Sequence, residues 1–167
     1  LADDLEFLGA NLSTSSSFDA SAIRLNVPVA KLADALPLMA DVALRPTFPA
    51  ADLDRLRKER LTSLVQARDN PAQLIGIAFP RIVFGETHRY GTSANGLPAA
   101  IEALSVADLQ TFYRAHYRPD NAALLVVGDV TPASVMPMLE KMFGGWKADG
   151  VAPLVAQVPM APQLKSR

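Results

Sequence analysis

Two short stretches near the start of the chain alternate apolar and polar residues, and this pattern limits the fold more than any other feature of the sequence. Residues 11–18 carry the first alternating set and residues 21–28 carry the second. Side chains of a strand point to opposite faces in turn, so each stretch predicts a strand. One face of the first would carry Leu12, Thr14, Ser16 and Phe18, and one face of the second Ile23, Leu25 and Val27. The break at Asp19 and Ala20 predicts a tight turn, and we expect the two strands to pair antiparallel.

The stretches that follow have helical rather than alternating spacing. Leu32, Leu36 and Met39 fall on one stripe of a helix from about Lys31 to Leu44, in which Pro37 should bend the first turns. Ser105, with Asp108 three residues on, has the spacing of a capping box and should start a helix. We expect the remaining helices at residues 50–68, 71–85, 106–117 and 132–143, with Leu53, Leu56, Leu61, Leu64 and Val65 of the first pointing inward.

An uncharged apolar run precedes Gly128 and Asp129. Such a run predicts a strand buried on both faces, over residues 122–129. We expect it to share one sheet with the strands at 11–18 and 21–28. The order of elements therefore predicts an α+β fold, with a mostly antiparallel sheet and helices packed on one side of it.

The domain organisation follows from the length and from proline usage. With 167 residues, half of them hydrophobic, the chain can bury a core. Residues 1–147 predict one α+β module, and the prolines of residues 148–167 predict a linker to a following module. Leu1 opens what reads as a helix already under way, so we expect the module to be truncated at its N-terminus.

Composition excludes several classes of function. The 16 basic and 17 acidic residues nearly balance, so no nucleic-acid footprint is expected. No apolar run approaches the roughly 20 residues of a membrane span. There is no cysteine and there are only two histidines, His88 and His116, which could barely supply a catalytic zinc site.

Several segments together resemble one family, the pitrilysin/insulinase zinc peptidases, which include the mitochondrial processing peptidases. The segments follow one another in the family's order across most of the chain. They are "LADDLEFLGANLSTSSSFDASAIRLNVP", "LADALPLMADVALRPTFPAADLDRLRKERL", "DNPAQ", "HRYGTSANG", "YRPDNAALLVVGDV" and "MFGGW".

The resemblance implies the repeated α+β module of a clamshell that encloses a peptide chamber. Active members carry an H-x-x-E-H zinc motif, with a third ligand from a glutamate on a later helix. In the register fixed by Asp69-Asn70-Pro71, that ligand position is Ser63 and a supporting glutamate position is Leu56. Neither residue supplies a carboxylate, so we expect no catalytic residue and no metal in this chain. The H-x-x-E-H motif would lie before Leu1, where its presence cannot be read.

Two further sets of residues have weaker functional interpretations. Arg89 and Tyr90, in a glycine-rich loop, could touch a peptide in the chamber, although anchoring of the loop explains them as well. Tyr117, Arg118 and Asn121 resemble the family's "Tyr-Arg-Pro-x-Asn" element. Their expected role is structural, with Arg118 and Asn121 holding backbone carbonyls.

The leading hypothesis is therefore a non-catalytic module of a zinc-dependent metallopeptidase, which helps to form the peptide chamber and supports an active half elsewhere. One alternative is a catalytically dead assembly subunit of a processing-peptidase-like complex. Another is part of an active zinc endopeptidase whose metal motif lies outside this sequence. Expected partners are a catalytic or companion half of the same family, unfolded peptide, and a second copy of the fragment. Zinc would belong to the parent protein or the partner half. The location is left open with a lean toward a bacterial periplasm or another extracytoplasmic site, because the lack of cysteine suits such a setting but equally suits a cytoplasm.

Overall fold

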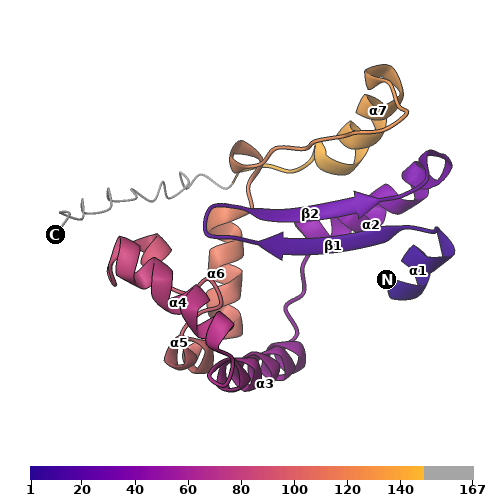
Figure 1. The fold of residues 1–167 in the computed structure, drawn as a ribbon. Helices are drawn as coiled ribbons and strands as arrows, with labels where there is room; N and C mark the ends of the chain where they lie inside the picture. The colour runs from indigo at the N-terminus through magenta and orange to yellow at the C-terminus, as the bar shows by residue number, and fades with distance from the viewer. Residues whose placement is uncertain (149–167) are drawn as a thin grey trace. The chain divides into compact units, whose positions relative to one another are not determined.

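The computed structural model describes residues 1–148, which divide into two compact units. Unit 1 combines residues 1–47 with residues 112–148, and unit 2 is residues 48–111 (Figure 1). The predicted linker at 148–167 lies outside the described residues, except for Ala148. The elements are α1 (Ala2–Phe7), β1 (Asn11–Ser16), β2 (Ser21–Asn26), η1 (Val29–Lys31), α2 (Leu32–Leu44), α3 (Ala50–Ala67), α4 (Pro71–Phe84), η2 (Arg89–Gly91), α5 (Pro98–Ala103), α6 (Val106–His116), η3 (Pro119–Asn121) and α7 (Pro132–Phe143).

Unit 1 contains the predicted hairpin. Strands β1 and β2 pair antiparallel, with Leu12 opposite Leu25 and Thr14 opposite Ile23. The turn is closed by Ser17, whose Oγ accepts hydrogen bonds from the backbone N–H groups of residues 19 and 20 at 3.3 and 3.2 Å. Helix α2 packs against β2, as the two lie together in Figure 1. The alternation in the sequence therefore predicted both the strands and their pairing.

The buried apolar side chains of unit 1 come from two helices. Ala35, Leu36 and Ala40 of α2 are at most 4% exposed, and Val135 of α7 is 5% exposed. Helix α2 begins at Leu32, next to its predicted start at Lys31. It contains Pro37 and continues past it to its predicted end at Leu44. Helix α7 has the predicted bounds 132–143 and begins in a capping box between Thr131 and Ser134.

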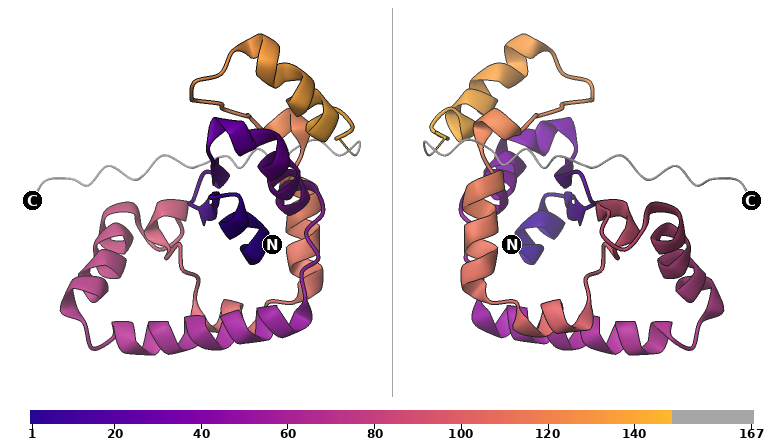
Figure 2. Two further views of the ribbon diagram at one scale, coloured as in Figure 1. Left: turned by 90° about the vertical axis from the view of Figure 1, so that its right-hand side faces the viewer. Right: turned by 90° about the vertical axis from the view of Figure 1, so that its left-hand side faces the viewer.

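Unit 2 is built on the long helix α3, shown in two further views in Figure 2. Helix α3 contacts α4 and α5, and α4 contacts η2. Asn70 begins α4, because its Oδ1 accepts hydrogen bonds from the N–H groups of residues 72 and 73 at 3.1 and 3.4 Å. Pro80 lies within α4, which continues past it to Phe84. The short helix α5 was not predicted from the sequence.

The inward face predicted for α3 is partly wrong. Leu56 and Val65 are 52% and 60% exposed, whereas Leu53, Leu61 and Leu64 are half-buried. The amphipathic pattern correctly placed the leucines on one face of α3. The neighbouring helices α4 and α5 cover only part of that face along the helix.

The prediction of a strand at 122–129 is also wrong. The described residues contain a single sheet, the β1–β2 hairpin, and residues 122–127 form no strand. The composition of the run suits a strand buried on both faces. The outer face of the hairpin, however, carries Ser13, Ser15 and Arg24, all exposed. A strand that is apolar on both faces would lack cover on that side. The α+β class itself is confirmed.

Candidate functional site

The face of α3 that the resemblance assigns to a metal carries no set of metal ligands. The Ser63 hydroxyl donates a hydrogen bond to the backbone carbonyl of Glu59, one turn earlier, at 2.9 Å. The Glu59 carboxylate accepts from Arg55 Nη1 at 2.8 Å. Leu56 offers no donor atom and is exposed. Between these positions lies Arg60, whose Nη1 donates to Asn95 Oδ1 at 3.1 Å.

Zinc does not fit the residues present on this face. A zinc site takes three or four ligands from histidine, cysteine or carboxylate side chains. Positions 56, 60 and 63 lie on one side of the helix by their spacing, and they supply an apolar group, a cation and a neutral hydroxyl. Among residues 1–148 no group of three or more histidine, cysteine, aspartate or glutamate side chains lies close enough to hold a metal.

The loop that contains Arg89 and Tyr90 is held by an aromatic cluster. His88 is 5% exposed, and its ring stacks on Phe84 with centroids 5.3 Å apart. Its Nδ1 accepts a hydrogen bond from the Tyr90 N–H at 3.1 Å, and the Tyr90 ring lies edge-on to Phe84. Tyr90 is half-buried, while Arg89 is exposed. The two candidate peptide contacts therefore differ, because Arg89 is exposed whereas Tyr90 is partly covered by the aromatic cluster.

The same loop contains a position where only glycine fits. A Cβ on Gly91 would lie 1.8 Å from the carbonyl oxygen of Gly85, far closer than two atoms can approach. The backbone of the loop thus folds back against the end of α4 at Gly85, and Arg89 lies within the loop that is closed in this way.

Two of the residues with a predicted structural role, Tyr117 and Arg118, lie between α6 and η3, and the third, Asn121, ends η3. Asn121 Nδ2 donates to the backbone carbonyl of His116 at 3.0 Å, the type of contact expected for it. Arg118 is 5% exposed and donates from Nε and Nη2 to both carboxylate oxygens of Asp120, at 2.9 and 2.8 Å. The hydrogen bond from Arg118 lowers the pKa of Asp120. The sequence reasoning missed Asp120, although its position two residues after an arginine was visible.

Tyr117 belongs to an aromatic pair. Its ring lies 5.0 Å from that of Tyr113, centroid to centroid, and the Tyr113 hydroxyl donates to the Ala43 carbonyl at 2.8 Å. Burial raises the pKa of Tyr113, and the neighbouring Tyr117 adds to the shift. The contact joins residues that lie far apart in the chain, at the end of α2 and on α6.

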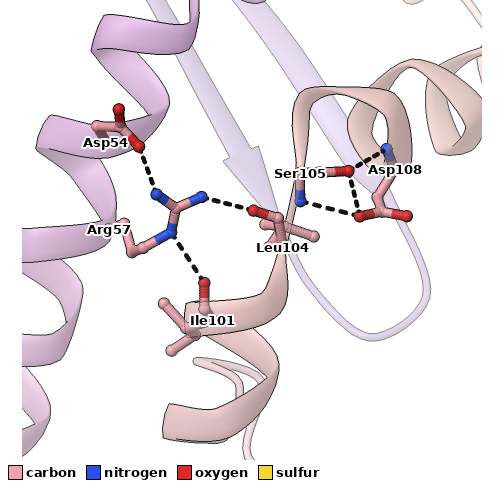
Figure 3. A network of polar contacts seen from close by, with 6 residues as sticks. All are labelled: Asp54, Arg57, Ile101, Leu104, Ser105 and Asp108. Atoms are coloured by element: carbon pink, nitrogen blue, oxygen red, sulfur yellow. Dashed lines mark hydrogen bonds and ion pairs between the residues drawn. The ribbon is translucent and has the colours of Figure 1, made fainter.

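A network around Arg57 of α3 was not predicted from the sequence. Its side chain is only 23% exposed. Its Nε donates to the Ile101 carbonyl at 3.2 Å, a second nitrogen donates to the Leu104 carbonyl, and Asp54 accepts from the third (Figure 3). Arginine thereby satisfies carbonyl groups at the C-terminal end of α5, which lack partners within the helix.

The predicted capping box of α6 follows immediately after this network. The Asp108 N–H donates to Ser105 Oγ at 3.3 Å, and the Ser105 N–H donates to Asp108 Oδ2 at 2.9 Å. The Ser105 hydroxyl donates to the same carboxylate oxygen at 2.6 Å (Figure 3). These hydrogen bonds from Ser105 lower the pKa of Asp108, the side-chain bond most.

Comparison with known sequences places this chain beside zinc peptidases. Residues 103–167 match the family described as the peptidase M16 inactive domain. A Mycobacterium tuberculosis (strain ATCC 25618 / H37Rv) protein, named an uncharacterized zinc protease, is 23% identical over 154 residues. That alignment covers 92% of this chain but 35% of the mycobacterial protein, so the chain spans about a third of its relative.

Solved structures show the same relationship. The peptidase M16 inactive domain from Pseudomonas fluorescens superposes on 96% of this chain and 39% of its own, with a TM-score of 0.85 and 25% identity. The periplasmic protease PqqL from Escherichia coli superposes on 94% of this chain and 18% of its own, with a TM-score of 0.78 and 18% identity. The second similarity, at this identity, concerns the fold alone.

Proposed function

Because this chain belongs to the pitrilysin-like M16 peptidases, we propose that it is a non-catalytic module of a larger zinc-dependent peptidase. In this proposal the module forms part of the wall of a chamber that holds unfolded peptide. It also supports an active half of the same family, which carries the zinc and cleaves the peptide bond.

The observation that carries the proposal is the state of the α3 face. The Ser63 hydroxyl is engaged by the backbone of its own helix, and Leu56 supplies no ligand atom. Arg60 adds a positive charge between them, which opposes binding of a divalent cation. The match of residues 103–167 to an inactive domain agrees with this chemistry.

The metal content of the purified 167-residue chain tests the proposal. After dialysis against buffer without chelator, we expect zinc far below one ion per chain and no cleavage of a quenched fluorescent peptide. Zinc at one ion per chain that is lost on His88→Ala or His116→Ala would overturn the proposal. As a matched check, Leu56→Glu together with Ser63→Glu should still bind less than one zinc per chain, because the histidines of H-x-x-E-H are not supplied by these 167 residues.

The names of the relatives favour an active rather than a dead parent protein. The mycobacterial relative is named a zinc protease, which supports zinc in the protein to which this module contributes. Peptidase activity of the full-length protein that disappears on zinc removal and returns on zinc addition would support this version. A full-length protein with neither zinc nor activity would instead support the assembly-subunit alternative.

We further propose that Arg89 and the exposed apolar side chains of α4 contact the peptide. Helix α4 contacts η2, and its Ile75, Phe79 and Ile82 are 65%, 64% and 73% exposed. An unfolded peptide offers apolar side chains for this surface and carboxylates for the guanidinium. Arg89→Ala should weaken binding of fluorescein-labelled, reduced and carboxymethylated lactalbumin several-fold, whereas Arg68→Ala, an exposed arginine of the same unit, should not. Equal binding by both variants would contradict the contact.

An extracytoplasmic location, the bacterial periplasm in particular, is a further part of the proposal. The composition of the chain, which has no cysteine, is compatible with it. No helix within residues 1–148 has the length and apolar character needed to cross a membrane. Fractionation of cells that express the full-length protein would test the location directly.

A further inference from the structure

A titratable side chain is buried in the loop that joins α4 to η2. His88 is 5% exposed, and its ring contacts those of Phe84 and Tyr90, with centroids 5.3 and 5.5 Å away. Its Nδ1 accepts a hydrogen bond from the Tyr90 N–H at 3.1 Å, so the side chain caps the start of η2. A ring nitrogen that accepts a hydrogen bond carries no proton, so the neutral imidazole has its proton on Nε2.

The backbone of residues 85–92 closes around this ring. The His88 N–H donates to the Gly85 carbonyl at 3.4 Å, and the Gly91 N–H donates to the His88 carbonyl at 2.9 Å. Carbonyl acceptors do not change with pH, whereas an imidazole acceptor gains a proton in the range between about pH 8 and pH 5. Of these three hydrogen bonds, the one from Tyr90 to the ring is therefore the one that acid can break.

A proton on Nδ1 and the closed loop exclude each other. The imidazolium has a proton on each nitrogen, so its Nδ1–H would face the Tyr90 N–H, with two donors and no acceptor between them. The same proton would place a charge on a side chain that has almost no contact with water. Both effects disappear when the loop opens and the ring and the Tyr90 N–H bond to water.

Most charged groups on the elements around this ring are cations. They are Arg81 at the end of α4, Glu86 in the loop, Arg89 in η2, and Arg60 of α3, which reaches the following loop at Asn95. The Glu86 carboxylate lies 2.8 Å from Nη2 of Arg81 and is engaged by it. Tyr90 adds a phenol, a group that carries no charge between about pH 5 and pH 8. A positive charge on His88 would thus join a set of mainly positive side chains.

We propose that residues 85–92 form a pH-sensitive switch, closed while His88 is neutral and open once His88 takes up a proton. The open loop binds one proton more than the closed loop, so a fall in pH shifts the population toward it. Opening frees the side chains of Arg89 and Tyr90 from the position that the aromatic cluster gives them. This inference goes beyond the proposed function and does not depend on it.

Hydrogen exchange of the Tyr90 amide, followed by NMR in the 167-residue chain, tests the switch. Its protection, relative to an unfolded peptide at the same pH, should fall several-fold between about pH 7.5 and about pH 5, with protection in α3 unchanged. His88→Asn keeps an acceptor for the Tyr90 N–H but does not titrate, so protection should become independent of pH. His116→Asn removes the other histidine of the chain and should behave as the wild type. Equal protection at both pH values, the same fall in His88→Asn, or a fall that includes α3 would overturn the proposal.

A second measurement uses the wild-type chain alone, since His88→Asn also removes the ring that stacks on Phe84. Ring ¹⁵N resonances should show the proton of His88 on Nε2 at about pH 7.5, as the hydrogen bond requires. On acidification, the chemical shift of the Tyr90 amide should change over the same pH range in which Nδ1 gains its proton. A proton on Nδ1 at about pH 7.5, or a Tyr90 amide that does not follow the titration of the ring, would also overturn the proposal.

Discussion

Unit 1 and unit 2 are stabilised by different kinds of contact. In unit 1, the apolar side chains Ala35, Leu36, Ala40 and Val135 are excluded from solvent between α2 and α7. In unit 2, Ala67 is the only apolar residue of 48–111 that is buried. Helix α4 instead leaves Ile75, Phe79 and Ile82 largely exposed, although its sequence is as apolar as that of a core helix.

The contacts that order unit 2 are mostly polar and directional. Arg57 holds two carbonyl groups of the α5 region, Arg60 reaches Asn95, and His88 accepts from the loop backbone. Apolar packing depends on volume, whereas these contacts depend on the identity and geometry of single donors. We therefore expect truncation of a buried apolar side chain to destabilise unit 1, and replacement of a hydrogen-bonding side chain to destabilise unit 2.

The largest effect is expected from Leu36→Ala in unit 1. Leu36 is 4% exposed, and removal of a buried leucine side chain costs about 2–4 kcal/mol through lost burial and the remaining cavity. Leu74→Ala makes the same truncation on α4, where the side chain is 44% exposed, and should cost less than about 1 kcal/mol. Urea denaturation measures both. Equal losses would remove the difference drawn between the two units.

An intermediate effect is expected from Arg57→Ala in unit 2. Loss of the guanidinium leaves the carbonyls of residues 101 and 104 without this donor, which should cost about 1–2 kcal/mol. Arg57→Lys keeps the charge but not the forked donor, and should recover only part of the loss. Lys58→Ala, an exposed neighbour on α3, should be nearly neutral. Hydrogen exchange followed by mass spectrometry should show faster exchange in α5, with unit 1 unchanged.

The smallest effect is the pH dependence of two carboxylates, Asp108 in unit 2 and Asp120 in unit 1. Hydrogen bonds lower the pKa of each in the folded chain, from Ser105 and Arg118 respectively. A lowered folded pKa stabilises the chain above the unfolded value of about 3.9, and this stability is lost as pH falls through the folded pKa. Asp108→Asn and Asp120→Asn should each flatten the decline of stability below about pH 4. Carboxyl NMR titration checks the pKa values, and a wild-type pKa at or above the usual value would contradict the prediction.

Local patterns in the sequence predicted most of the elements. The hairpin, the helices and the Ser105–Asp108 capping box depend on residues within a few positions of one another, and these predictions are confirmed by the structure. The start of α4 likewise follows from Asn70 and Pro71.

Features that depend on distant partners could not be predicted in the same way. Whether residues 122–127 enter a sheet depends on a neighbour with matching faces, and composition does not identify one. The exposure of Leu56 and the partial burial of Arg57 depend on where α5 packs along α3. The helical spacing of apolar residues in α3 does not specify that position. For the candidate site, the resemblance to the family located the α3 positions. The hydrogen bond from Ser63 to its own helix depends on the side-chain conformation, which the sequence does not give.

Unit 1 is discontinuous along the chain, and this has a consequence for how it forms. The Tyr113 hydroxyl reaches the Ala43 carbonyl only after the whole of residues 48–111 has been synthesised. Closing that loop carries an entropic cost, but the cost rises slowly, by about 0.6 kcal/mol for each doubling of loop length. Unit 2 can therefore acquire insertions at little expense to unit 1, whereas any step that delays emergence of residues 112–148 from the ribosome delays completion of the unit 1 core.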